Sequence, residues 1–147
     1  MIIRLATAED VPAIVALLAD DELGAQRETP HDLEPYRTAF AVLDASPHDE
    51  LVVAEVDGEV VGTLQFRVLP GLAQRGMVRG QVEAVRVASR LRGQGLGEQL
   101  MKWVVERARD KGCSVVQLTS DRKREAAHRF YARLGFQATH EGFKLRL

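Results

Sequence analysis

The sequence predicts an α+β fold in which helices flank a mixed central sheet. The first observation is the order of apolar patterns: a strand, two helices, three strands, a helix, a strand, a helix and closing strands. The second is Asp57-Gly58 between two strand-like runs, a dipeptide typical of a tight antiparallel hairpin. The third is a glycine-rich turn at residues 92–97 that leads from a strand into an amphipathic helix.

Each expected element follows from its apolar period. Strands, in which apolar residues alternate or run together, are expected at residues 2–5, 51–56, 60–69, 77–87, 114–119, 136–139 and 143–147. Helices, in which apolar residues recur every three or four positions, are expected at residues 11–18, 33–43, 94–111 and from a cap at Ser120 or Asp121 to residue 134.

Local signals refine the N-terminal part. Thr7 and Asp10 have the spacing of a capping box at the start of the first helix. Residues 20–32 interrupt the helical period with Gly24, Pro30 and mixed charges. We therefore expect a loop between the first two helices.

The composition is that of an ordinary globular domain, expected to span residues 1–147 as one unit. Charged residues make up 28% and the formal net charge is −1, so no basic field indicates a nucleic-acid partner. The single cysteine, Cys113, excludes internal disulfides and is expected to be a buried apolar thiol. Without a charged leader or an apolar run of about 18 residues, we expect a cytoplasmic protein with no membrane partner. No metal is expected, because no metal-ligand spacing links His31, His48, His128 and His140.

Residues 81–100, QVEAVRVASRLRGQGLGEQL, predict an anion site. Glycines allow the backbone to approach a ligand, and the first turn of the following helix leaves N–H groups without intrahelical partners. A dinucleotide fingerprint would require glycine at position 98, which is Glu98, and a nucleoside-triphosphate loop would require Gly-Lys-Ser or Gly-Lys-Thr, which is absent. The expected ligand is a phosphate compound of another kind.

Two motifs resemble the GCN5-related N-acetyltransferase (GNAT) superfamily. The first is Arg92-x-x-Gly95-x-Gly97 directly after a Val-Glu-Ala-Val-Arg-Val strand. In that family this turn binds the pyrophosphate of acetyl-coenzyme A. The second is AHRFYARLGF at residues 127–136, which is similar to the family's penultimate helix, where a tyrosine precedes a Gly-Phe stop. Both occur in the order and at the distance that the family uses.

The resemblance implies a single-domain acyl-CoA N-acyltransferase fold whose fourth and fifth strands splay apart around the pantetheine arm. The backbone of residues 85–87 would pair with the pantetheine amides. Arg124 stands where many members have asparagine, within a basic run, residues 122–124, that would reach phosphate or simply form a solvated face. The implied cofactor-binding residues are Val85, Arg86, Val87, Arg92, Gly93, Gln94, Gly95, Leu96, Gly97, Arg124 and Tyr131.

Acetyl transfer to an amine requires a base, and Glu83 is the candidate. Its position matches a catalytic glutamate in some family members. If no bulge intervenes, it shares a strand face with Val85 and Val87, which would disfavour its charge. The alternative is a carboxylate that attracts a cationic substrate or pairs with an arginine.

Tyr131 is the candidate acid that protonates the departing thiolate, and it matches the family's tyrosine. The alternative is an aromatic side chain that only packs between helix and sheet. His128 lies three residues earlier and would be placed to assist it.

Two further assignments stay open. Arg92 either contacts phosphate or braces the glycine loop. Acceptor recognition is expected between the first two helices, where acidic residues would attract a cationic amine or would simply be solvated. The residues concerned are Asp20, Asp21, Glu22, Glu28 and Tyr36.

The sequence therefore predicts an acetyl-CoA-dependent N-acetyltransferase that acts by direct transfer on a primary amine, and the acceptor that we expect is a small molecule. The alternatives are a non-catalytic acyl-CoA-binding or regulatory module and a protein N-acetyltransferase. A homodimer formed through the apolar last strand is a further expectation.

Overall fold

A computed structural model describes residues 1–147. The chain divides into two compact units, Met1–Gln117 and Leu118–Leu147, and the single-domain assignment stays a prediction. The strands are β1 (Ile2–Leu5), β2 (Asp49–Val56), β3 (Glu59–Leu69), β4 (Arg79–Val87) and β5 (Val115–Leu118). The helices are α1 (Val11–Ala19), α2 (Glu22–Arg27), α3 (Glu34–Ala45), α4 (Ala73–Gly76), α5 (Leu96–Asp110) and α6 (Glu125–Arg133), with 3-10 turns η1 (Ala8–Asp10) and η2 (Ser89–Leu91).

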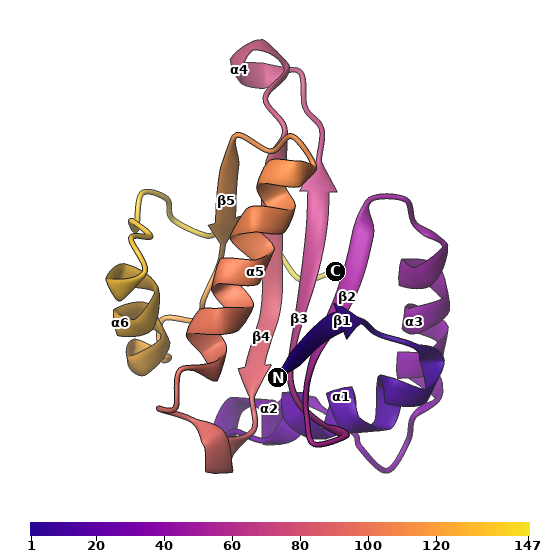
Figure 1. The fold of residues 1–147 in the computed structure, drawn as a ribbon. Coiled ribbons are helices and arrows are strands. Elements are labelled where there is room, and N and C mark those ends of the chain that lie inside the picture. The colour runs from indigo at the N-terminus through magenta and orange to yellow at the C-terminus, as the bar shows by residue number, and fades with distance from the viewer. The chain divides into compact units, whose positions relative to one another are not determined.

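The strands form one sheet in the order β1-β2-β3-β4-β5. The first three pairings are antiparallel, whereas β5 runs parallel to β4 (Figure 1), so the predicted mixed sheet is confirmed. Asp57 and Gly58 join β2 to β3 with φ angles of 51° and 81°. These positive angles are those of a tight hairpin turn, as the dipeptide predicted.

Helix α5 packs on β3 and β4 (Figure 1). Its buried residues are Leu100, Met101, Val104 and Ala108, and the strands contribute Leu64, Phe66 and Val82, which are at most 1% exposed. A Cβ added at Gly80 would lie 2.8 Å from the Phe66 ring, and one at Gly62 would lie 3.0 Å from Leu100. Glycine at these positions therefore permits the close approach of the core side chains. The opposite face of the sheet is covered by α1 and α3.

An ion-pair network fastens β1 to β2 and to the start of α1. Arg4 donates to both carboxylate oxygens of Asp10, at 2.7 and 3.0 Å, and to Glu55 at 3.0 Å. The backbone N–H of Thr7 donates to Asp10 at 2.7 Å, which confirms the predicted capping box. Asp10 is 8% exposed, and its hydrogen bonds to Arg4 lower its pKa to about 2.

We predicted a loop at residues 20–32, but this segment contains a short helix, α2. The Asp21 side chain accepts a 2.6 Å hydrogen bond from Gly24 N–H and caps this helix. A Cβ at Gly24 would lie 1.9 Å from the Leu18 carbonyl oxygen. Gly24, which interrupts the helical period in the sequence, is thus the residue that allows α2 to pack this closely against α1.

In the second unit, α6 begins later than predicted. Arg124, rather than Ser120 or Asp121, occupies its N-cap position. The Asp121 carboxylate instead accepts a 2.9 Å hydrogen bond from Lys123 N–H within the preceding turn. A local side-chain bond to the backbone thus competes with the cap.

The predicted strands at residues 136–139 and 143–147 do not form. Phe143 and Leu145 alternate as in a strand, yet they are 93% and 88% exposed. A strand requires a hydrogen-bonded neighbour, and residues 119–147 contain no strand that pairs with this segment. The apolar alternation alone was therefore misleading.

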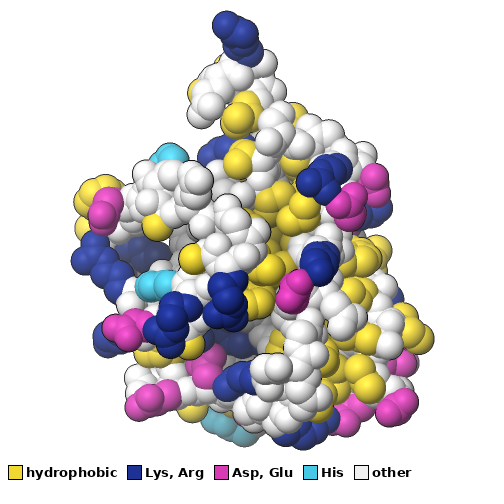
Figure 2. Space-filling view, turned by 60° about the vertical axis from the view of Figure 1, so that its left-hand side comes forward, with side chains coloured by type: hydrophobic (Ala, Val, Ile, Leu, Met, Phe, Trp, Pro, Cys, Tyr) yellow, Lys and Arg dark blue, Asp and Glu magenta, His cyan; other side chains and the backbone are white.

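The surface in Figure 2 carries both signs of charge, with Lys and Arg side chains beside Asp and Glu. None of the helices is both long and apolar enough to cross a membrane.

Candidate active site

The centre of the candidate site is a β-bulge in β4. Gln65 of β3 is paired with Glu83, but Thr63 is paired with Arg86, so β4 uses one residue more than β3. Ala84 has a φ angle of 53°, a left-handed conformation that is uncommon for alanine. The extra residue places Glu83 and Arg86 on one face. The condition for Glu83 to share a face with Val85 and Val87 is not met.

Glu83 has polar neighbours on its face of the sheet. Arg67 of β3 lies close enough for Glu83 to help raise the Arg67 pKa, although the hydrogen bonds from Arg67 to Asp49 are the main cause. Those bonds measure 2.6 and 2.8 Å. Glu83 itself is exposed. The carboxylate therefore lies in a polar, accessible position and not in an apolar pocket.

The C-terminal half of β4 extends beyond β5. Ser114 N–H donates to Val78 O at 2.9 Å, and the Gln117 side chain donates to that of Gln81 at 2.8 Å. These contacts place the short β5 beside the first half of β4. Residues 85–87 follow this paired region.

In the half of β4 that β5 does not cover, Val85 and Val87 direct their backbone groups away from β3. Ala88 N–H donates to Val61 O of β3 at 2.8 Å. Because neighbouring residues of a strand turn their N–H and C=O groups to opposite sides, Val85 and Val87 turn theirs away from β3. Val85 O and Val87 O accept hydrogen bonds from Arg86 and Arg92, so the N–H groups are what this strand edge presents to an extended ligand.

The glycine loop follows this edge and opens α5. Gly93 and Gly95 have φ angles of 78° and 84°, and a Cβ at either position would meet nothing within 4 Å. Gly95 is the N-cap of α5, and no side chain caps the helix. The N–H groups of the first turn, beginning at Leu96 and Gly97, have no intrahelical acceptor. The loop and helix dipole together favour an anion here.

Arg92 braces the base of this loop. Its Nε donates to Val87 O at 3.2 Å and its Nη2 donates to Asp20 O at 2.7 Å. The Asp20 carboxylate accepts from the backbone N–H of Ser89 at 2.7 Å and from its hydroxyl at 3.1 Å. The bracing interpretation of Arg92 thus has direct contacts, and a phosphate contact stays a prediction.

The neighbouring residue Asp21 holds β4 itself. Its carboxylate lies 3.3 Å from Nε of Arg86, and both side chains are 17% exposed. Arg86 also donates from Nη1 to Val85 O at 2.9 Å. Asp20 and Asp21, which we expected to attract the acceptor, therefore hold the loop and the strand in place.

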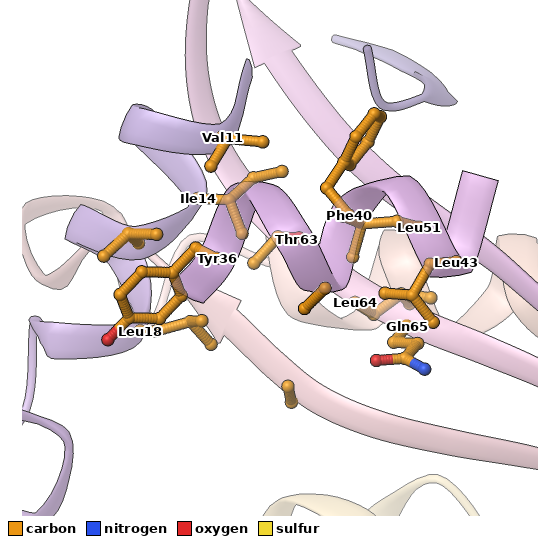
Figure 3. A pocket seen from close by; sticks show the side chains of 13 residues that line it. Val11, Ile14, Leu18, Tyr36, Phe40, Leu43, Leu51, Thr63, Leu64 and Gln65 are labelled. Atoms are coloured by element: carbon orange, nitrogen blue, oxygen red, sulfur yellow. The ribbon is translucent and has the colours of Figure 1, made fainter. Parts of the chain in front are cut away.

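A cavity of about 170 Å³ lies between α1, α3 and the sheet (Figure 3). Side chains of α1 and α3 form two of its walls, and β2, β3 and β4 form the third. Ala84, the bulge residue and the sequence neighbour of Glu83, also lines the cavity. The lining residues are Val11, Ile14, Val15, Leu18, Tyr36, Ala39, Phe40, Leu43, Leu51, Thr63, Leu64, Gln65 and Ala84.

Residues 12–136 match the model of the acetyltransferase (GNAT) family. The chain belongs to this family. It is 33% identical over 146 residues to an aminoalkylphosphonate N-acetyltransferase of Salmonella typhimurium, covering 96% of this chain and 88% of the relative. It is 32% identical to an L-methionine sulfoximine/L-methionine sulfone acetyltransferase of Pseudomonas aeruginosa, covering 92% of this chain and 79% of the relative.

Solved structures share this fold along nearly the whole chain. A Bacillus halodurans C-125 protein described as a transcriptional regulator has a TM-score of 0.95 and 43% identity, with 99% of both chains covered. A putative acetyltransferase from Agrobacterium tumefaciens has a TM-score of 0.88 and 25% identity, with 100% of both chains covered. The GNAT protein described here has the predicted α+β fold and is an N-acetyltransferase. Enzymes of its family generally use acetyl-coenzyme A as the acetyl donor.

The second unit of this GNAT protein carries Tyr131 on α6. Its ring makes edge-on contacts with Phe130 and Phe136, at centroid distances of 5.2 and 5.8 Å. His128 bonds back to Asp121 O at 2.8 Å. The packing of Tyr131 is thus established within its unit, and its role as an acid stays a prediction.

Asp20 and Ser89 are the residues of this GNAT protein whose roles the sequence did not predict. They lie 69 positions apart, and although Ser89 falls within residues 81–100, no pattern there links it to Asp20. Only Asp20 stood among the acidic residues expected to face the acceptor. An aspartate directly after a helix and a serine in the turn that follows a strand are common loop residues, so no local signal linked them.

Proposed function

We propose that this protein transfers the acetyl group of acetyl-coenzyme A directly to the primary amine of a small molecule. The observation that carries the proposal is the uncapped α5 N-terminus, opened by Gly93 and Gly95 and placed directly after the β4 strand edge. The names of the relatives support a small acceptor, since aminoalkylphosphonates and methionine sulfoximine are small amines.

The donor would be bound by backbone groups. The amides of residues 93–97 would hold the diphosphate, because an open, positively polarised loop suits two adjacent negative charges. The strand edge at residues 85–87 would pair with the pantetheine amides. A Cβ at Gly93 or Gly95 would meet no protein atom, so the loop offers space for a bulky anion.

The ammonium must lose one proton before its nitrogen attacks the thioester carbonyl and a second as the amide forms, and the sulfur released when the C–S bond breaks must gain one. The thioester supplies the activated acetyl group. Glu83 would remove the ammonium proton, directly or through water, since its carboxylate is exposed on the face that carries the cavity. A backbone N–H of residues 85–87 would stabilise the charge on the carbonyl oxygen. Tyr131 would donate its phenolic proton to sulfur.

Calorimetry and a thiol-release assay test this proposal together. Acetyl-coenzyme A should bind in a titration, and free thiol should appear when small primary amines are added. Heat without thiol release for any small amine or peptide would indicate a non-catalytic acyl-CoA-binding module. Release with peptides alone would identify a protein N-acetyltransferase, and absence of binding would refute the proposal.

A further inference from the structure

We propose that the cavity between α1, α3 and the sheet receives the apolar body of the acceptor, which is therefore a primary amine carried on a compact alkyl or aromatic group. This inference rests on the proposed function and adds the class of substrate.

The walls of the cavity are almost entirely hydrocarbon. Figure 3 shows aliphatic side chains of α1 facing the rings of α3, with Leu51 of β2 beside them. The labelled side chains that make up these walls are Val11, Ile14, Leu18, Tyr36, Phe40 and Leu43. Such a lining favours an apolar group because little polar surface is desolvated when it enters.

The polar groups in the lining already have protein partners. The Thr63 hydroxyl donates to Val52 O at 2.9 Å, and the Tyr36 hydroxyl donates to Glu28 at 2.6 Å. The Gln65 side-chain amide donates to Asp49 at 3.4 Å. A charged or strongly polar group placed deep inside would lose its hydration without equal compensation. The interior therefore selects against such groups.

The position of the cavity relative to Glu83 orients the acceptor. Gln65 and Ala84 both line the cavity. Gln65 is the register partner of Glu83, and Ala84 is the next residue along β4. An acceptor whose apolar group fills the cavity would thus have its ammonium at the end where Glu83 lies. Residues 85–87, the proposed pantetheine edge, begin immediately after Ala84.

Substitutions on α3 test the role of the cavity without altering the rest of the site. Ala39 and Ala41 are both exposed residues of the same helix, but only Ala39 lines the cavity. Ala39→Phe fills the cavity, Ala39→Leu fills part of it, and Ala41→Phe is the matched control. Thermal melts of all variants would establish that they fold.

Two probes, 2-phenylethylamine and methylamine, report on the cavity. The wild-type protein should acetylate 2-phenylethylamine with the higher kcat/KM, and Ala39→Phe should lower the ratio of the two kcat/KM values at least about tenfold, which corresponds to 1.4 kcal/mol. Ala39→Leu should lower it less, and Ala41→Phe should preserve it. Equal ratios in wild type and both Ala39 variants would overturn the inference while leaving the proposed function intact.

Binding provides a readout that does not depend on turnover. Methyl NMR signals of Ile14 and Leu43 should shift when 2-phenylethylamine is added to the wild type or to Ala41→Phe, and not when it is added to Ala39→Phe. If no amine is acetylated, these shifts still support the cavity as an apolar amine site while the proposed function fails. Absence of shifts in the wild type would refute the cavity assignment.

Discussion

The carboxylate of Asp20 holds Ser89 by two hydrogen bonds, one from the backbone N–H at 2.7 Å and one from the hydroxyl at 3.1 Å. Asp20 ends α1, and Ser89 begins the turn that leads into the glycine loop. With the bond from Arg92 to Asp20 O, this contact fixes the loop to the connection between α1 and α2. The position of the proposed diphosphate site therefore depends on a residue outside it.

Asp20→Ala should weaken acetyl-coenzyme A binding. Loss of two charge-assisted hydrogen bonds frees the start of the loop, and we expect the Kd to rise about tenfold. Calorimetric titration measures this change. Glu22→Ala, two residues later and exposed, removes the same charge and should leave the Kd unchanged. Equal effects of both variants would point to long-range charge instead of the Ser89 contact.

Gly95→Ala should impair donor binding in addition to stability. Alanine at a φ angle of 84° is strained, which costs roughly 1–2 kcal/mol of folding free energy. Gly58→Ala, at 81° in the β2–β3 turn, should cost a similar amount because a Cβ meets nothing at either site. Denaturant melts compare the two stabilities. Only Gly95→Ala should raise the Kd for acetyl-coenzyme A, and a matching rise in Gly58→Ala would contradict a local role for the loop.

Glu83→Gln should reduce turnover more than donor affinity. Removing a general base typically costs about 10²-fold or more in rate. Steady-state thiol release gives kcat, and calorimetry gives the Kd of the donor. Glu9→Gln, an exposed carboxylate in η1, makes the same change elsewhere and should keep full activity. A Glu83→Gln enzyme with an unchanged kcat would leave Glu83 with no more than an electrostatic role.

Tyr131→Phe tests the acid. The substitution keeps the ring, and with it the edge-on contacts to Phe130 and Phe136, but removes the proton donor. We expect kcat to fall about 10²-fold with little change in donor Kd. Equal losses in kcat and affinity would mean that the side chain packs and does not donate.

Asp10 should make stability depend on acid pH. Its pKa falls from the ordinary 3.8 to about 2 in the folded protein, mainly through the hydrogen bonds from Arg4. The unfolded chain therefore takes up the proton first. The ionised Asp10 carboxylate therefore contributes about 2 kcal/mol to the free energy of unfolding above pH 4, and this contribution is lost as the pH falls toward 2. Chemical denaturation at several pH values should show this loss of stability in the wild type and in Asp44→Asn, a control at an exposed aspartate. Asp10→Asn should not show it. A loss of the same size in Asp10→Asn would refute the assignment of this pH dependence to Asp10.

Helices and strands with a clear apolar period or a capping motif could be predicted from the sequence, because their signals are local. The strand at residues 2–5 has the bounds predicted for it, and the capping box formed as expected. The glycine turn likewise predicted the opening of α5, since each positive φ angle there falls on a glycine. Local signals also identified the family through its two motifs.

Features that depend on tertiary neighbours could not be predicted from the sequence. The bulge at Ala84 carries no glycine, so alternation through residues 81–87 gave the wrong face for Glu83. The contact from Asp20 to Ser89 joins distant segments whose proximity only the fold creates. The last residues alternate like a strand, yet no neighbour pairs with them. In each case the local pattern predicted one arrangement, but residues distant in the sequence determined the structure.

The extra residue in β4 makes this strand sensitive to its length more than to its composition. Deleting Ala84 would restore uninterrupted alternation and carry the guanidinium of Arg86 to the side of the sheet that packs on α5. Val87 would move the opposite way, out of the apolar layer. Substitutions within β4 should thus disturb the fold far less than the deletion of a single residue from it.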